Sequence, residues 1–457
     1  MSRRDYENEL VTAMQSMSPE EKKLVDDDKY VLPAVDPTLS IYEAQPTDIG
    51  VRRDYVIDYV PLAPVSQGSV VEFYIPSTNL YWLSLDKSWL TIKGKIVKSD
   101  GAKLTSADKV SCVNALGMSM WRECDIMLQQ KSMSTDIGPL YSYKSIFNLY
   151  AYTHNDYLSR GAQTFLFYPD TPGNVDSVVI SKGPNLGLVA RHEFVTKDEF
   201  SMDAPLGHDL SLQNKLLPPG IEIKIKLTRQ SNEFVLMSAN LTENYQIVLS
   251  ECTLHLHGLE LSPGMLTKQH ELLSDHNALY HFRRSILRSF TLAKSTKTWS
   301  MAQPFGTHIP FDIIIALVPS SGFLGKYSKN PFYFDHCNVT NITFRAEGYQ
   351  PVSIRPNFAL NQMSGMYKAL YEPDMGQISP AGLLNMSDMK NGLALFRLKL
   401  GQSGYERAFR AKHGQTHLSI EMSAELSEAY TLIAYGRRHD GYSCDIFKNI
   451  YVGSDCF

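Results

Sequence analysis

The sequence has few cysteines, and none stands in a pattern that would hold a metal ion or build a disulfide framework. Its 457 residues contain six cysteines, and no two are spaced as Cys-x-x-Cys. Zinc sites and small disulfide scaffolds both need regular cysteine spacing. We therefore expect free or buried thiols in a reducing compartment. The six are Cys112, Cys124, Cys252, Cys337, Cys444 and Cys456.

Long hydrophobic runs and an excess of positive charge are also missing. The longest apolar run begins at Ile313 and is far shorter than the roughly 20 residues that a membrane helix needs. The charged residues 1–5 lead into no apolar core, so we expect neither a secretory signal nor a membrane span. A net charge of −4 argues against a surface that holds a nucleic-acid backbone.

Catalytic motifs are absent as well. The chain has no Gly-x-Ser-x-Gly elbow and no His-Glu-x-x-His helix. The segment Gly322–Lys326 superficially resembles a phosphate loop, but it has two residues where such a loop has four between the glycine and Gly-Lys. We predict a surface loop there. We also predict that the protein is not an enzyme and has no catalytic, cofactor-binding or metal-binding residues.

The best candidate for a metal site is His255-Leu256-His257 with Glu260. Alternate positions on a strand place both imidazoles on one face, and the pattern is similar to the cupin signature. However, the gap before Glu260 is one residue short of the cupin gap, and strand alternation turns Glu260 to the opposite face unless Gly258 forms a bulge. We favour histidines that face solvent or a partner, with metal binding as the alternative.

What the sequence does contain is apolar residues at alternate positions. Hydrophobic residues make up 43% of the chain, and its length suits two domains of about 200 residues plus an arm. In 90–97, 221–227 and 418–424 apolar and polar residues alternate, as in strands with one buried face. With only one short helix expected per half and no βαβ pattern, we predict an all-β protein of two antiparallel sandwiches.

The region 280–351 is organised as three predicted strands, Arg284–Leu292, Phe311–Val318 and 332–344, before a turn at Glu347-Gly348. The run Ile313–Val318 is apolar without interruption, which is typical of a strand covered on both faces.

The first half of the chain repeats this layout at an offset of about 220 residues, which indicates an internal duplication. The matched pairs are Phe73–Ile75 with Phe290–Leu292, Leu90–Val97 with Ile313–Val318, the hairpin at Gln129-Gln130 with that at Glu347-Gly348, and the helical segment Tyr143–Tyr152 with Asn361–Tyr371.

We predict an N-terminal arm at 1–45, a first sandwich at 46–245 and a second at 246–457. In the arm, Tyr6, Leu10, Met14 and Met17 recur at helical spacing, and residues 18–21 form a capping box, so two short helices are expected. The arm is either a solvated tail or a segment that docks on a neighbouring subunit.

Several runs resemble the major capsid proteins of the Polinton/Maverick and adintovirus group, over about residues 50–440. Of these, 325–332 (Gly-Lys-Tyr-Ser-Lys-Asn-Pro-Phe) is the most specific. The arm before Tyr42 has no counterpart, and Ser77-Thr78-Asn79 replaces a glycine-rich segment of that family. The other runs are 59–62, 72–76, 83–90, 141–145, 169–173, 280–284 and 290–292.

This resemblance implies a double jelly roll whose homotrimer forms a pseudo-hexameric capsomer of an icosahedral capsid. It implies a virion protein that is made in the host cytoplasm, with assembly in the nucleus. Its partners would be other copies of itself and penton or minor capsid proteins, and the capsid would enclose double-stranded DNA without sequence-specific binding.

Under this hypothesis, trimer contacts should be large and apolar at the centre, while contacts between trimers should be flatter and more polar. The segments Pro319–Lys329 and Asn155–Gly161 are predicted to supply contacts between subunits. Two alternatives remain open: a vertex or spike protein of a capsid, and a double-sandwich hydrolase or lectin-like protein.

Overall fold

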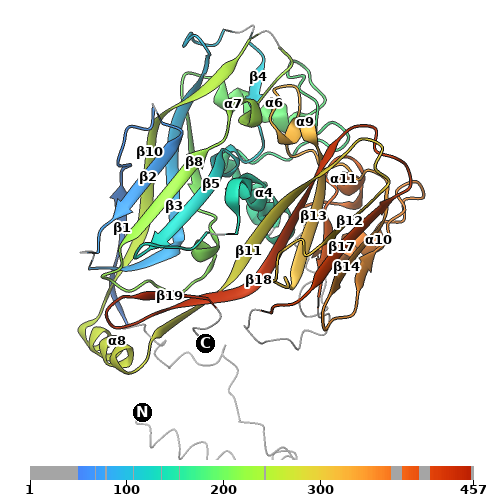
Figure 1. Cartoon of the computed structure of the whole chain (residues 1–457). Helices are drawn as coiled ribbons and strands as arrows, with labels where there is room; N and C mark the ends of the chain where they lie inside the picture. The colour runs from blue at the N-terminus through green and yellow to red at the C-terminus, as the bar shows by residue number, and fades with distance from the viewer. Residues whose placement is uncertain are drawn as a thin grey trace, which may run out of the picture. The chain divides into compact units, whose positions relative to one another are not determined.

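The computed structural model of the chain describes residues 50–66, 68–77, 80–105, 108–134, 136–153, 155–240, 243–371, 383–400 and 412–453. The predicted arm at 1–45 lies outside these residues. The described part forms one compact unit from Gly50 onward, built mainly of antiparallel strands (Figure 1).

The first half of the chain folds into a sandwich of two four-stranded sheets. The first sheet has the strand order β1 (Val51–Tyr59), β10 (Tyr245–Leu261), β3 (Trp82–Lys98), β7 (Phe200–Pro205). The second has the order β2 (Val70–Ile75), β8 (Ile223–Arg229), β5 (Trp121–Leu128), β6 (Lys131–Ser132). A separate pair joins β4 (Val110–Cys112) to β9 (Leu236–Ser238).

The second half repeats this arrangement strand for strand. One sheet has the order β11 (Ala278–Leu292), β18 (Tyr430–Cys444), β13 (Asp312–Pro319), β16 (Phe396–Lys399), with β19 (Ile450–Val452) paired to β18. The other has the order β12 (Thr298–Ala302), β17 (Thr416–Met422), β14 (Val339–Ala346), β15 (Val352–Ile354). Each half therefore has the eight-stranded connectivity of a jelly roll, and the all-β prediction is confirmed.

The duplication read from the sequence is right for three of its four pairs. β3 corresponds to β13, the β5–β6 hairpin to β14–β15, and the helix that follows one hairpin to the helix that follows the other. The match of Phe73–Ile75 to Phe290–Leu292 is wrong, because those residues lie in β2 and β11, which occupy different sheets. The counterpart of β2 is β12.

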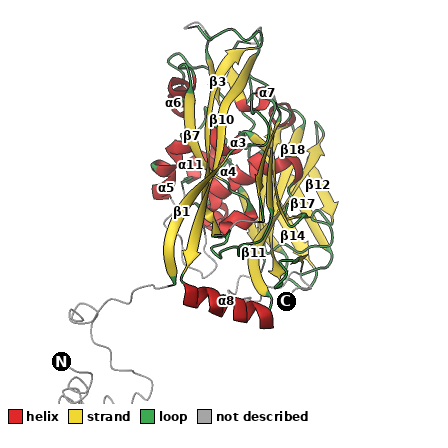
Figure 2. Ribbon diagram, turned by 90° about the vertical axis from the view of Figure 1, so that its left-hand side faces the viewer, coloured by secondary structure: helices red, strands yellow, loops and turns green. Residues whose placement is uncertain are grey.

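Two further details differ from the prediction. β14 begins at Val339 instead of residue 332, because Cys337 and Asn338 adopt positive φ angles of 45° and 47° and turn the chain just before the strand. Helices are more numerous than one per half (Figure 2). They are α3 (Leu116–Ser119), η2 (Gly138–Leu140), α4 (Tyr141–Tyr152), α5 (Asn155–Ser159), η3 (Gly161–Phe165), α6 (Leu186–Val195), η4 (Asp209–Leu212), α7 (Asn232–Val235), α8 (Pro263–Asp275), α9 (Ser320–Phe323), α10 (Ser364–Tyr371) and α11 (Met386–Lys390).

The division at residue 245 stays a prediction as a domain boundary. The strand pairing nevertheless assigns residues 245–261 to the first sandwich, because β10 lies between β1 and β3. The helix α8, which has no buried residue, then connects the last strand of the first sandwich to the first strand of the second.

The turn of the β5–β6 hairpin generates a prediction about stability. Gln129 and Gln130 have φ angles of 46° and 67°, as a two-residue type I′ turn requires, and glycine adopts such angles without strain. We expect Gln130→Gly to raise the free energy of unfolding by about 0.5–1 kcal/mol, measured by urea denaturation. The same change at Gln246 in β10, whose φ is not positive, should lower it by a similar amount. A loss of stability in Gln130→Gly would contradict the turn assignment.

Candidate functional site at the junction of the two sandwiches

The helix α4 lies between the two sandwiches and contacts both (Figure 1). Ten of its twelve residues are buried, so α4 exposes almost none of its surface to solvent. Its sequence is rich in tyrosine and contains no acidic residue. A helix that is apolar or aromatic nearly all round is typical of a position inside a protein.

Aromatic side chains make the contact between α4 and the second sandwich. The ring of Phe147 lies 5.4 Å from that of Phe334 and 6.0 Å from that of Tyr435. Tyr143 stacks on Phe323 with 5.7 Å between ring centres, and meets a second phenylalanine, Phe332, edge-on at 5.5 Å. These separations are those of favourable aromatic pairs.

A buried carboxylate, Asp312, lies at the end of α4. Arg397 binds it through two nitrogens, at 2.9 Å and 2.6 Å, Arg437 forms a second ion pair, and the Tyr152 hydroxyl donates to it at 3.1 Å. The Arg437 guanidinium also lies over the Tyr152 ring, 3.6 Å from its centre. Burial alone would raise the pKa of Asp312, but the two guanidinium groups outweigh burial and hold that pKa well below its ordinary value.

A second buried ion pair joins α4 to Asp209 in η4, and Asp209 in turn contacts the first strand of the second sandwich. Lys144 lies 2.8 Å from Asp209, and the two side chains are 0% and 2% exposed. Asp209 accepts hydrogen bonds of 2.7 Å from both the backbone N–H and the hydroxyl of Ser285 in β11. The Asp209 carboxylate is thus shared between the two sandwiches.

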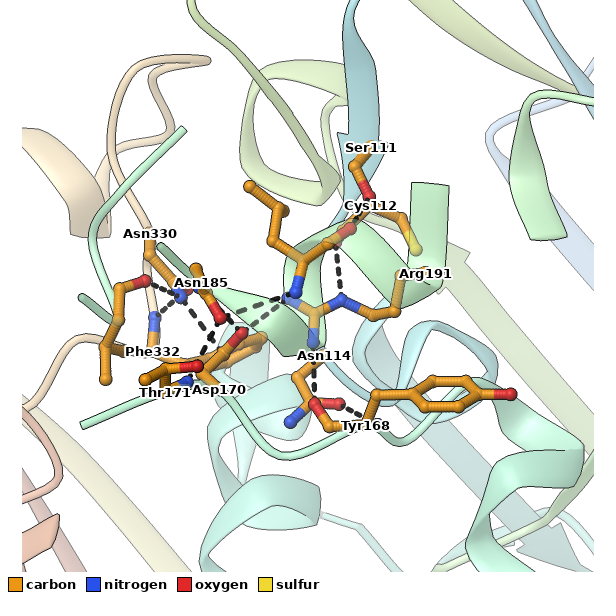
Figure 3. A network of polar contacts seen from close by, with 12 residues as sticks. Ser111, Cys112, Asn114, Tyr168, Asp170, Thr171, Asn185, Arg191, Asn330 and Phe332 are labelled. Atoms are coloured by element: carbon orange, nitrogen blue, oxygen red, sulfur yellow. Dashed lines mark hydrogen bonds and ion pairs between the residues drawn. The ribbon is translucent and has the colours of Figure 1, made fainter. Parts of the chain in front are cut away.

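A third group of polar contacts connects the 170–185 region with the loop before β14 (Figure 3). Arg191 binds Asp170 at 2.7 Å, and Asn185 donates to the same carboxylate at 2.9 Å. From the second sandwich, Asn330 donates to the Val175 carbonyl at 2.8 Å, and its own backbone N–H donates to Asp176 at 2.6 Å. Because these buried polar groups are hydrogen-bonded, they avoid the free-energy cost of burying a polar group without a partner.

The segment Gly322–Lys326 lies at the surface, as predicted, with Leu324 77% exposed and Lys326 exposed. Its inner side packs against the first sandwich. Gly325 has a φ of 91°, and a β-carbon there would lie 3.1 Å from the backbone nitrogen of Phe234. Its glycine is therefore explained by close packing of the loop on α7. The neighbouring Tyr327 donates its hydroxyl hydrogen to the Tyr245 carbonyl at 2.8 Å. The prediction that this loop contacts other subunits stays untested. Gly325 and Tyr327 make their contacts within the chain.

The histidines of the candidate metal site lie half-buried on the outer face of the first sheet. His255 bonds to Asp58 at 2.6 Å and to Thr91 at 3.0 Å, while His257 lies 3.7 Å from Asp54. Glu260 instead binds Arg52 at 3.0 Å. Among the residues that the structure describes, no three histidine, cysteine, aspartate or glutamate side chains are grouped as metal ligands would be.

A serine–histidine pair also occurs near the junction, but its geometry differs from that of a hydrolase. Ser134 and the Nε2 atom of His208 are 2.6 Å apart, and the other ring nitrogen accepts from the backbone N–H of Leu210 at 3.1 Å. No carboxylate therefore orients this imidazole. Burial, together with the charge of Lys144, lowers the pKa of His208 to about 3, so the ring is a poor general base at neutral pH.

The described cysteines agree with the sequence prediction of free thiols. Cys112, Cys124, Cys252 and Cys444 are buried and Cys337 is partly buried, with no disulfide among them. Burial raises the pKa of the first three thiols to about 12, which makes them unreactive at neutral pH.

In the same described part of the chain, no helix is both long and apolar enough to cross a membrane.

No protein-family model and no curated protein sequence matches this chain. Solved structures do. A chain of the cryo-EM structure of the Sputnik virophage matches with a TM-score of 0.58 and 9% identity, over 93% of both chains. The Faustovirus major capsid protein matches with a TM-score of 0.55 and 9% identity, over 97% of this chain and 96% of that one. The mavirus major capsid protein matches with a TM-score of 0.50 and 10% identity, over 93% of this chain and 96% of that one.

The chain has the double jelly roll fold of viral major capsid proteins. At this level of identity the shared feature is the arrangement of strands, not the residues.

In this double jelly roll the junction residues named above were not found from the sequence. One signal was present: Asp312 directly precedes the apolar run at Ile313, and a carboxylate beside a fully buried strand must have a partner.

The Asp312 cluster generates a stability prediction. Asp312→Asn would leave two buried guanidinium groups without their counter-charge, so we expect the apparent free energy of unfolding to fall by roughly 3–5 kcal/mol. Asp198→Asn, at a carboxylate that is 94% exposed, is the control and should change it by less than about 0.5 kcal/mol. Urea denaturation measures both.

The pH dependence of this effect has a definite sign. Because the folded-state pKa of Asp312 is lowered, its contribution is complete above the unfolded pKa of about 4 and is lost as the pH falls through the folded value. The deficit of Asp312→Asn should therefore be constant between about pH 5 and 8 and shrink below about pH 4. A deficit that disappears at neutral pH would contradict the ion-pair account.

Proposed function

We propose that this chain is the major capsid protein of a virus or integrated viral element. Three copies would form a pseudo-hexameric capsomer, and many such capsomers would build an icosahedral capsid. The observation that carries the proposal is the presence of two jelly rolls of identical strand order in one chain. Three such chains present six similar lobes, which suits a near-hexagonal lattice.

The junction supports this function because a capsid tile needs lobes at a fixed angle. The carboxylates of Asp312 and Asp209 and the aromatic rings around α4 connect the two sandwiches at several separate points. Interfaces between domains are often small and allow relative motion, whereas a large, buried one resists it. The function we propose therefore resides in surfaces between subunits and involves no catalytic step.

The finer parts of the proposal concern partners and location. We propose that the particle encloses double-stranded DNA without reading its sequence, in keeping with the net charge of −4. Penton or minor capsid proteins would occupy the vertices, since trimers that imitate hexamers leave the fivefold positions open. The resemblance of runs such as 325–332 to the Polinton/Maverick and adintovirus group favours that source.

Size-exclusion chromatography with light scattering tests the proposal. The purified chain should elute with about three times its mass of 51.5 kDa. A stable monomer at micromolar concentration would count against a capsid tile, and a pentamer would indicate a vertex protein. Stoichiometric metal by elemental analysis would favour the double-sandwich hydrolase or lectin-like alternative.

A further inference from the structure

A cavity of about 140 Å³ lies beside α4, where β3, α5 and the loop that joins β7 to η4 approach the helix. Much of its lining is apolar and buried, including Leu85, Leu149 and Leu206. Two other lining residues, Tyr157 and Leu212, are 44% and 64% exposed, so the cavity is open to solvent on their side. An engineered apolar cavity of about 150 Å³ binds benzene. The space beside α4 is therefore large enough for one six-membered ring.

One wall of this cavity is an irregular part of β3. Residues 84–89 of β3 pair with residues 255–257 of β10, so three residues of β3 have no counterpart in β10. Asp86 lies in this excursion and lines the cavity. The corresponding strand of the second sandwich, β13, pairs with β18 without a shift of register. The excursion is thus a departure from the internal duplication, and irregular strands of this kind are over-represented beside functional sites.

The charged group of the lining is the carboxylate of Asp86, which is exposed. The Ser84 hydroxyl donates to it, and none of the cationic side chains that the structure describes forms an ion pair with it. The aromatic ring of Tyr157 lines the same cavity. A carboxylate and the face of an aromatic ring both attract cations. The cavity therefore combines an apolar interior with groups that favour a positive charge.

The other polar groups of the lining are mostly hydrogen-bond acceptors. Its serine and threonine hydroxyls each donate to a backbone carbonyl three to five residues earlier in the chain, at 2.7–3.1 Å. They are Ser88, Ser145, Thr153 and Ser211. Because a hydroxyl has one hydrogen, each can act toward a ligand only as an acceptor. Apart from the Asn148 amide and the Tyr157 hydroxyl, the polar side chains of the lining thus suit a ligand that donates hydrogen bonds.

We propose that this cavity binds a small primary amine whose apolar body has the size of about one six-membered ring. The apolar part would fill the space lined by Leu85, Leu149 and Leu206, and the ammonium group would donate to Asp86. An anionic ligand would meet a like charge and a set of acceptors, so the site discriminates against carboxylates and phosphates. Because the cavity is bounded by β3, α4 and the β7–η4 loop, a bound amine would also stabilise the folded chain.

Three probes that share a ring and differ in their polar group test the inference: benzylamine, benzyl alcohol and benzoate. Binding to the full chain is followed by NMR of ¹³C-methyl methionine, because Met118 lines the cavity, and Met118→Leu identifies its signal. We expect benzylamine to shift this signal saturably, with an affinity about tenfold above that of benzyl alcohol, as a charge-assisted hydrogen bond provides. Benzoate should leave the signal in place. A Met118 signal that about 10 mM benzylamine does not move, or equal affinities for the three probes, would overturn the inference.

A matched pair of substitutions tests the role of the carboxylate. Asp86→Asn keeps an acceptor for Ser84 and removes the charge, so we expect it to weaken benzylamine binding about tenfold and to leave benzyl alcohol binding unchanged. Asp198→Asn, at a carboxylate that is 94% exposed and does not line the cavity, should change neither affinity. Circular dichroism verifies that both variants are folded. If Asp86→Asn left benzylamine binding intact, or weakened both probes equally, Asp86 would not select the amine and the inference would fail.

Discussion

The burial of α4 between two sheets is the constraint on which the rest of the structure depends. A helix of twelve residues with ten buried can exist only when protein surrounds it, and here the second sandwich supplies part of that surrounding. In return, α4 covers the outer face of the sheet formed by β11, β18, β13 and β16. The central strands of this sheet, β13 and most of β18, are buried on both faces. Neither half could therefore be removed without exposing a large apolar surface of the other.

Charged groups at this interface complement the apolar contacts. Removing Asp312 and Asp209 from water is costly, and that cost is offset because each carboxylate has cationic and hydrogen-bonding partners held at short distances. Such pairs add little net stability compared with apolar packing, but they tolerate few alternative geometries. Their contribution at this junction is best understood as selecting one angle between the sandwiches.

The sequence predicts the strands better than it predicts the junction. The uninterrupted run at Ile313 and the alternation around Leu90 correctly separate a strand covered on two faces from a strand covered on one. The pattern does not say what provides the second cover, because α4 lies more than 150 residues earlier in the chain. For the same reason the pattern does not show that loop 322–326 packs on Phe234, because Phe234 is distant in sequence.

The polar residues of the junction were missed on physical grounds as well. A buried aspartate and an exposed one look alike in a sequence, and only the three-dimensional arrangement shows that Arg397 and Arg437 converge on Asp312. Similarly, His255 and His257 are spaced as ligands could be, yet each is directed to its own aspartate. Spacing along one strand cannot reveal which residues the neighbouring strands bring opposite.

The position of α4 in the first half has a consequence for how the chain is made. Domains usually fold in the order in which the ribosome releases them, at about 5–20 residues per second. The first sandwich is complete once β10 has emerged, but Tyr435 and Arg437 follow only after a further stretch of chain, which at that rate takes roughly ten to forty seconds. Throughout this interval the nascent protein displays an unpaired aromatic helix face, which is the kind of surface that molecular chaperones recognise.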